Sequence, residues 1–248
     1  MDRNKELDGK VAIVTGSARN IGRRTALELA DAGAAVVINA VTAKELCEEV
    51  AHEVEAAGGK AIPVLADITN QDDVDQMVAA TKDAFGGIDI LVNNAANRGH
   101  NKIVDMPFEE WKEITSIILD GSFLCTRAAV KHMAPNKWGR VIFLGGIGAY
   151  LGYPERCHVS TGKMGVVGMM HCLANELAAD GITVNVVAPG RIGGERAPSA
   201  GEPTGDTPPV GFVGMAPDVG RTIHFLCQPD ANFITGQTIH INGGGFLT

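Results

Sequence analysis

The stretch "VAIVTGSARNIGRR", residues 11–24, joins a short apolar run to a glycine-containing turn, and "TALELADAG" continues it with helical character. The apolar run is typical of a buried strand, and the segment after the turn is typical of a helix. Such a turn points backbone N–H groups and the positive end of the helix dipole at an anion, commonly a pyrophosphate. The stretch therefore predicts an α/β domain with a dinucleotide site at its first crossover.

Six more short runs rich in Val, Ile and Leu follow, and helix-length segments lie between most of them. Because each crossover between parallel strands lays a helix on the sheet, this alternation predicts a seven-stranded parallel sheet flanked by helices on both faces. We expect a single Rossmann-type, doubly wound domain over residues 1–248 with at least six helices. The predicted strands lie at 11–15, 35–39, 61–66, 88–93, 140–145, 182–188 and 237–242.

One segment, about 191–214, is rich in Gly and Pro and has no clear periodicity. A long irregular segment inside a compact domain is usually a binding loop, a lid or a disordered stretch. We expect a flexible loop on the substrate side of the domain.

The composition excludes several classes of partner. The chain has 21 basic and 29 acidic residues, a net charge of -8, and no basic cluster longer than the pair Arg23-Arg24, so a nucleic-acid partner is not expected. The first ten residues lack the apolar core of a signal peptide, and no run approaches the roughly 20 apolar residues of a membrane helix. Five scattered cysteines without a C-x-x-C pair indicate neither a disulfide framework nor a metal site. We expect a cytoplasmic protein without a membrane partner.

Several motifs in chain order resemble those of the short-chain dehydrogenase/reductase family. "TGSARNIG" is similar to its TGxxxGxG nucleotide motif, with Asn20 in place of the middle glycine, and the resemblance extends from about Leu7 to Phe246. It is similar in particular to members that reduce 3-oxoacyl groups on a carrier protein. The further matches are Asp67 in "LADIT", "NNAA" at 93–96, Lys163, Pro189-Gly190 and "GQTIHINGG" at 236–244.

The resemblance implies a dinucleotide cofactor and names residues for it. The first motif would surround the pyrophosphate, Asp67 and Ile68 would lie by the adenine, and the "NNAA" segment would border a ribose, although a plain strand end would also explain that segment. Asn adopts positive φ more readily than most residues, so the glycine turn can survive the change at position 20. The full set expected to bind the cofactor is Gly16, Ser17, Arg19, Asn20, Ile21, Gly22, Asn39, Asp67, Ile68, Asn94, Ala95, Ala96, Lys163, Pro189, Gly190 and Ile192.

The second strand predicts which dinucleotide binds. An acidic side chain at its end would bind a ribose 2'-hydroxyl, whereas a nearby arginine would bind a 2'-phosphate. The strand ends "VVINAVT" without Asp or Glu, and Arg19 lies in the glycine turn. We therefore expect NADP(H) rather than NAD(H), although Arg19 as a plain solvated cation remains the alternative.

The pattern departs from the family at its catalytic end. Family members pair a tyrosine with a lysine four residues later, and the lysine lowers the tyrosine pKa and holds the cofactor ribose. Alignment on Lys163 places Val159 at the tyrosine position, Gly146 at that of the serine and Ile118 at that of the asparagine. A positioned acid or base contributes about 10²–10⁴-fold to a rate, so the usual route is not expected to be efficient.

Several polar residues are candidates to replace the missing groups: Tyr153 and His158 first, then Cys157 and Tyr150. Tyr153 lies in a loop that borders the substrate in the family, and His158 adjoins Val159 but points about 100° away around the helix. Lys163 can still bind the cofactor ribose and completes the set of catalytic candidates. The substrate is expected to be a small carbonyl or alcohol compound.

Three functions stay open at this stage. The first is an oxidoreductase with an atypical proton path. The second is a catalytically degenerate dinucleotide-binding protein, acting as a sensor, a scaffold or a partner subunit. The third is a non-redox enzyme on the same fold. The resemblance also implies a homo-oligomer, a homotetramer or a homodimer.

Overall fold

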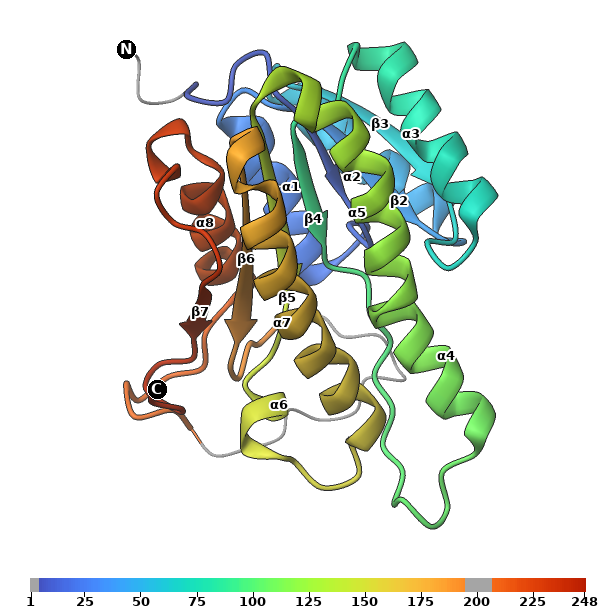
Figure 1. Ribbon diagram of the computed structural model, residues 1–248, viewed down its shortest axis with the longest axis vertical. Helices are drawn as coiled ribbons and strands as arrows, with labels where there is room; N and C mark the ends of the chain where they lie inside the picture. The colour runs from blue at the N-terminus through green and yellow to red at the C-terminus, as the bar shows by residue number, and fades with distance from the viewer. Residues whose placement is uncertain (1–4, 195–206) are drawn as a thin grey trace.

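The computed structural model describes residues 5–194 and 207–248. Within them, seven parallel strands form one sheet in the order β3-β2-β1-β4-β5-β6-β7 (Figure 1). The predicted sheet is confirmed, with each strand within two residues of its expected place. The strands are β1 (Val11–Val14), β2 (Ala35–Ala40), β3 (Lys60–Leu65), β4 (Ile90–Asn93), β5 (Gly139–Leu144), β6 (Ile182–Pro189) and β7 (Thr238–Ile241).

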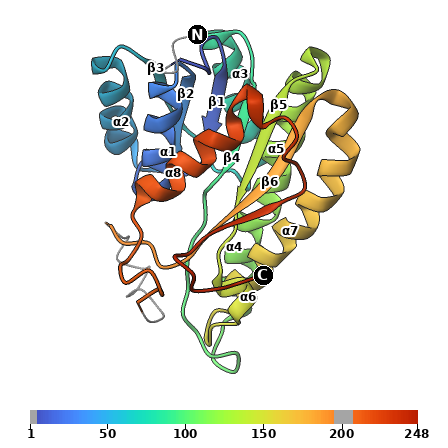
Figure 2. The ribbon, with the colours of Figure 1, turned by 90° about the vertical axis from the view of Figure 1, so that its left-hand side faces the viewer.

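Helices cover both faces of the sheet. Figure 2 shows α1, α2 and α8 on one side and α5 and α7 on the other, and two separate apolar cores match these two layers. The helices are α1 (Asn20–Asp31), α2 (Lys44–Ala56), α3 (Gln71–Phe85), α4 (Phe108–Ile118), α5 (Asp120–Met133), α6 (Gly148–Leu151), α7 (Cys157–Leu177) and α8 (Ala216–Cys227), with 3₁₀ turns at Ala134–Asn136, Ala178–Asp180 and Pro229–Ala231.

The burial of the strands follows their position in the sheet. Every residue of the central strands β1, β4, β5 and β6 is buried, as expected for parallel strands covered on both faces. In the edge strand β3 only Ala61 is buried, and β7 is of intermediate exposure throughout. The near-continuous apolar runs in the sequence therefore mark the centre of the sheet.

The topology determines where a ligand binds. The chain order reverses between the adjacent strands β1 and β4, and ligands of open α/β sheets bind beyond the carboxyl ends of the strands at such a switch point. In Figure 1 these ends point downward, where α6 and the start of α4 extend beyond the sheet.

The glycine- and proline-rich segment is described only at its ends. Ile192 forms an isolated parallel bridge with Gly214, the N–H of Gly193 donates to the Gly214 carbonyl, and the N–H of Gly214 donates to the Arg191 carbonyl. The two ends of the predicted loop therefore lie side by side, and its middle, 195–206, lies outside the described residues. No helix in the described part of the chain is long and apolar enough to cross a membrane.

Candidate cofactor cleft and substrate pocket

A cleft of about 1050 Å³ runs along the carboxyl ends of the strands, from the glycine turn after β1 to Lys163 on α7. All residues expected to bind the cofactor line it except Ser17, which is fully buried. Residues predicted separately along some 180 positions of sequence thus converge on one continuous cavity. The cleft also contains residues that the sequence did not single out, among them Val41, Thr42, Ala43, Arg98, Lys112, Glu113 and Ser116.

The turn between β1 and α1 has the conformation that its sequence predicts. Gly16 has φ 62° and Asn20 has φ 48°, so both lie in the left-handed region, and Asn20 maintains the turn where the family has glycine. A Cβ on Gly22 would lie 2.4 Å from the Gly16 carbonyl oxygen and 2.5 Å from Asn94 Nδ2. Gly22 is therefore required because the first turn of α1 presses against the loop and against Asn94.

Hydrogen bonds from β4 fix the backbone of the same turn. Asn94 Nδ2 donates to the carbonyl oxygens of Thr15 at 2.8 Å and Gly16 at 2.9 Å. The backbone N–H groups of Asn94 and Ala95 both donate to Thr15 Oγ1. The side chain of Asn94 is thus engaged with the turn, and the "NNAA" segment is more than a strand end.

Asn39 at the end of β2 also braces the turn. Its Oδ1 accepts from the Gly16 N–H at 3.2 Å, and its Nδ2 donates to the carbonyls of Val64 and Ala66. The Asn39 N–H donates to Ser17 Oγ, and that hydroxyl donates to the Val14 carbonyl. Asn39 is 2% exposed and Ser17 is fully buried. Asn39 therefore lines the cleft and also holds the turn in place, whereas Ser17 supports the turn from the interior.

The start of α1 suits an anion. Its N-cap residue, Arg19, provides no side-chain cap, and the first turn contains no acidic residue. Uncapped N–H groups at a helix N-terminus favour a phosphate through hydrogen bonding and the helix dipole. The residues present therefore fit a dinucleotide pyrophosphate.

The end of the cleft where the adenine is expected is formed by the residues after β3. Asp67 Oδ1 accepts from the N–H and the hydroxyl of Thr69, and the Asp67 N–H donates to Asp73. Ile68 is 4% exposed, and a Cβ on Gly121 of α5 would collide with its side chain. Ile68 thus contributes a buried apolar wall, and Asp67 is held by its own turn.

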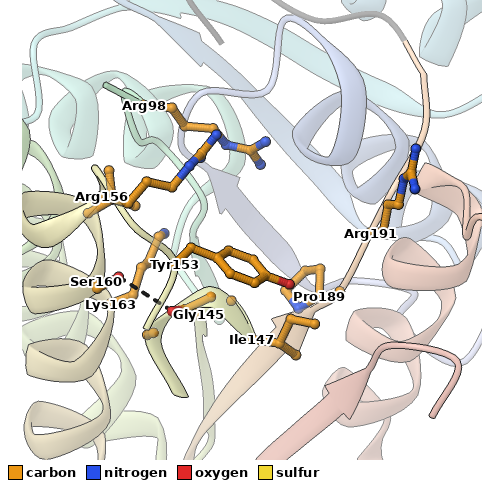
Figure 3. Close-up of a pocket in the computed structure, with 14 residues that line it drawn as sticks. Arg98, Gly145, Ile147, Tyr153, Arg156, Ser160, Lys163, Pro189 and Arg191 are labelled. Atoms are coloured by element: carbon orange, nitrogen blue, oxygen red, sulfur yellow. Dashed lines mark hydrogen bonds between the residues drawn. The ribbon is translucent and has the colours of Figure 1, made fainter. Parts of the chain in front are cut away.

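A second cavity of about 120 Å³ adjoins the cleft at its far end. It lies between the loop after β5, the start of α7 and the segment after β6 (Figure 3). The two cavities share the residues at their boundary, which are Arg98, Gly145, Gly146, Val159, Lys163, Pro189 and Gly190. A substrate in the second cavity would meet a cofactor in the cleft at this boundary.

Lys163 lies at the boundary between the two cavities. Its Nζ donates to the carbonyl oxygen of Leu144 at the end of β5. Burial, and secondarily the positive charge of Arg98, lower the pKa of Lys163 to about 7. The amine therefore changes its charge near neutral pH, in the range that suits a proton donor or acceptor.

The structure separates the other catalytic candidates. Tyr153 lines the second cavity, and its ring packs on Gly148. His158 is fully buried, its Nε2 lies 3.1 Å from Glu110 Oε1 on α4, and it lines neither cavity. A catalytic role for His158 is therefore not supported by its position, because its side chain is directed toward α4.

The three positions expected from the resemblance to differ at the catalytic end, Val159, Gly146 and Ile118, also have distinct surroundings. Val159 and Gly146 line both cavities, and a Cβ on Gly146 would meet no atom within 4 Å. Ile118 is 1% exposed and packs against Gly162 of α7, away from both cavities. A side chain at position 146 would thus have open space, whereas Ile118 has become part of the core.

Sequence reasoning missed three arginines of the second cavity, Arg98, Arg156 and Arg191. Each lies close in sequence to a motif that was singled out: Arg98 follows "NNAA", Arg191 follows Pro189-Gly190, and Arg156 precedes the helix of Lys163. The sequence did contain a signal for these arginines, because residues that follow parallel strands lie at the same edge of the sheet.

Comparisons with known proteins agree with the fold. A family model described as "Enoyl-(Acyl carrier protein) reductase" matches residues 16–245. A 3-oxoacyl-[acyl-carrier-protein] reductase from Synechocystis sp. is 40% identical, over 96% of this chain and 97% of the relative. The (2S)-[(R)-hydroxy(phenyl)methyl]succinyl-CoA dehydrogenase subunit BbsD from Thauera aromatica is 41% identical, over 97% and 98%. The crystal structure of a dehydrogenase/reductase from Sinorhizobium meliloti 1021 superposes with a TM-score of 0.88 at 31% identity, over 97% of this chain and 96% of the other. The chain belongs to the short-chain dehydrogenase/reductase family.

Proposed function

We propose that the protein is an NADP(H)-dependent oxidoreductase that interconverts a carbonyl and an alcohol on a small substrate. The observation that carries this proposal is the single cleft that joins the glycine turn to Lys163 and contains nearly every residue expected to hold a dinucleotide. Hydride transfer is the chemistry that the cofactor supplies when bound, and the protein chiefly provides orientation. The relatives named above are reductases and dehydrogenases, which supports the same class of reaction.

Arg19 supports NADP(H) over NAD(H). It is exposed and lines the cleft, and the residues at the end of β2 and just after it that line the cleft, from Asn39 to Ala43, include no carboxylate. A guanidinium there would pair with a 2'-phosphate, and hydrogen bonds to charged groups contribute about 1.5–3 kcal/mol. Removal of that pair corresponds to about a tenfold to hundredfold loss of affinity.

The proton path that we propose runs through Lys163. The amine lies where the two cavities meet, and its pKa of about 7 allows it to donate a proton to a nascent alkoxide and to recover it from water in the open cleft. Tyr153 lines the same cavity and would orient the substrate oxygen. This path needs neither a tyrosine at position 159 nor His158.

The cofactor is tested by titration with NADPH and NADH while nicotinamide fluorescence is followed. We expect tighter binding of NADPH, and Arg19→Ala should remove most of that preference. Arg23→Ala is the matched control, because Arg23 is a nearby cation that pairs with Glu53 and does not line the cleft. Equal binding of both dinucleotides by the unaltered protein would refute the NADP(H) preference.

The proton path is tested by turnover of a panel of carbonyl and alcohol compounds. For any substrate that turns over, Lys163→Met should lower kcat by about 10²–10⁴-fold, the usual contribution of a positioned acid. Tyr153→Phe should chiefly raise KM, since its ring remains in place. A kcat loss with Tyr153→Phe as large as that with Lys163→Met would assign the proton to the phenol instead.

A second candidate function, a dinucleotide-binding subunit without its own activity, is favoured by Val159, which lines the catalytic boundary with a hydrocarbon side chain. The Thauera relative is by name one subunit of a dehydrogenase. Tight NADPH binding with no turnover over the whole panel would favour this function. Absence of dinucleotide binding would favour a non-redox enzyme.

Self-association is also a proposal. We infer a homotetramer or homodimer in which α5 and α7 contribute to the contacts. Phe123 on α5 is 47% exposed and Met164 on α7 is 42% exposed, and large apolar side chains of this kind are typical of interfaces. Sedimentation of the purified protein tests it, and a monomer at micromolar concentration would refute it. The cytoplasmic location stays a prediction.

A further inference from the structure

We propose that Lys163 is a nucleophile that captures small aldehydes and ketones as imines at the boundary of the two cavities. This activity goes beyond the proposed function, because it needs neither a dinucleotide nor hydride transfer. The ligand class is a short carbonyl compound that fits the second cavity, whose volume is about 120 Å³.

Lys163 lies where a carbonyl compound can reach it. It lines both cavities, as do Gly146 and Val159. A Cβ on Gly146 would meet no atom within 4 Å, so the carbon atoms of a ligand have room at this boundary. Figure 3 shows Lys163 among the residues that surround the second cavity. An aldehyde bound in this cavity therefore lies beside the lysine.

The hydrogen bonding of the Lys163 amine leaves it able to attack a carbonyl carbon. Its Nζ donates to the Leu144 carbonyl, and this bond uses an N–H group rather than the nitrogen lone pair. None of the described residues that line the second cavity is acidic, and in the described part of the chain no carboxylate pairs with Nζ. The neutral amine therefore keeps its lone pair for a ligand.

The residue at position 159 gives the amine apolar surroundings. Val159 precedes Lys163 by four residues on α7, so the two side chains lie on the same face of the helix. A hydrocarbon there neither hydrogen-bonds to the amine nor stabilises its charge. Burial, and then the positive charge of Arg98, lower the pKa of Lys163 to about 7. Lysines in apolar or cationic surroundings are the ones that form Schiff bases with carbonyl compounds.

The reaction balances without a further reactant. The lone pair of Nζ forms a bond to the carbonyl carbon, and one N–H proton ends on the carbonyl oxygen, which gives a carbinolamine. This intermediate loses its hydroxyl group and the remaining N–H proton as water, and a C=N bond is left. The hydroxyl groups of Tyr153 and Ser160 line the same cavity and can donate a proton to the leaving hydroxyl. Hydrolysis reverses both steps, so the capture is reversible.

Reductive trapping on the cofactor-free protein tests the inference. The probe is butanal, and sodium cyanoborohydride converts any imine into a stable secondary amine. Intact-mass spectrometry counts the butyl groups, and peptide mapping assigns them to Lys163, to other lysines or to the amino terminus. Lys163→Met removes the amine, and Lys44→Met is the control, because the Lys44 side chain is 63% exposed and lines neither cavity.

A second pair of variants tests the access to the amine separately from its pKa. Gly146→Leu places a side chain in the open space at the boundary and leaves the amine of Lys163 in place. Gly168→Leu is the control, because Gly168 is exposed on the same helix as Lys163 and a Cβ there also meets no atom within 4 Å.

We expect selective trapping at Lys163. At pH 7 an amine with a pKa of about 7 is about half neutral, whereas an ordinary lysine is neutral in only about 0.03% of molecules. The butyl group should therefore appear on Lys163 at least 100-fold faster than on Lys44. Gly146→Leu should slow trapping at Lys163 at least tenfold, and Gly168→Leu should leave its rate unchanged.

The inference is overturned if Lys163 is trapped no faster than Lys44, or if Gly146→Leu is trapped as fast as Gly168→Leu. The peptide map of the unaltered protein decides the first point even where Lys163→Met does not fold. NADPH titrations of the same protein keep the two proposals apart. NADPH binding without trapping overturns this inference alone, whereas trapping without NADPH binding supports it and overturns the proposed function.

Discussion

Replacement of Lys163 by Met should change the pH dependence of stability in a defined direction. In the folded protein the pKa of Lys163 is lowered from its ordinary 10.5 to about 7, first by burial and then by Arg98. Between these two values the unfolded chain binds more protons than the folded one. Stability therefore rises as pH rises through that window, and this slope disappears with the amine.

The size of the effect follows from the two pKa values. Each unit of pH changes the free energy of unfolding by up to about 1.4 kcal/mol when the two states differ by one proton. The difference is about half a proton at pH 7 and nearly one at pH 8 and 9. Between pH 7 and pH 9, the unaltered protein should therefore gain about 2 kcal/mol relative to Lys163→Met.

Urea unfolding of both proteins at pH 7, 8 and 9 measures this difference. Contributions that do not depend on pH, such as the lost bond from Nζ to the Leu144 carbonyl, cancel when slopes are compared. Lys44→Met is the control, because the Lys44 side chain is 63% exposed. Parallel stability curves for the unaltered protein and Lys163→Met would refute the lowered pKa, and with it the proposed proton path.

Two further predictions use glycines whose surroundings differ. Gly146→Ser combined with Val159→Tyr should raise turnover of a confirmed substrate by about 10²–10⁴-fold, since position 146 has open space for a side chain; a folded double variant with unchanged turnover would contradict the alignment. Gly22→Ala should lower Tm and weaken NADPH binding at least tenfold, because its Cβ would lie 2.4 Å from a carbonyl oxygen of the turn. Gly168→Ala on α7, where a Cβ meets nothing within 4 Å, should instead add about 0.5–1 kcal/mol of stability, so equal stability of the two variants would count against the close packing.

The fold and the cofactor cleft were predictable because their signals are local. A few neighbouring residues are enough to predict the glycine turn, the start of α1 and the ends of the strands. They do so through their backbone conformation or through the burial of the strand. Asn20 illustrates this, since its tolerance of positive φ follows from its residue type and the structure shows φ 48°. The partners of individual side chains were harder to predict from the sequence. Asn39 was expected to bind the cofactor, and it lines the cleft, but its amide also bonds to the glycine turn and to the carbonyls of Val64 and Ala66.

The second cavity was not predictable in the same way because it depends on how separate loops meet. Sequence spacing placed His158 off the Val159 face of α7, and the structure directs it to Glu110, a residue on a different helix. No local pattern reveals that Arg98, Arg156 and Arg191 line one cavity, since each lies in a different loop. Their convergence follows from strand order, which is a tertiary property.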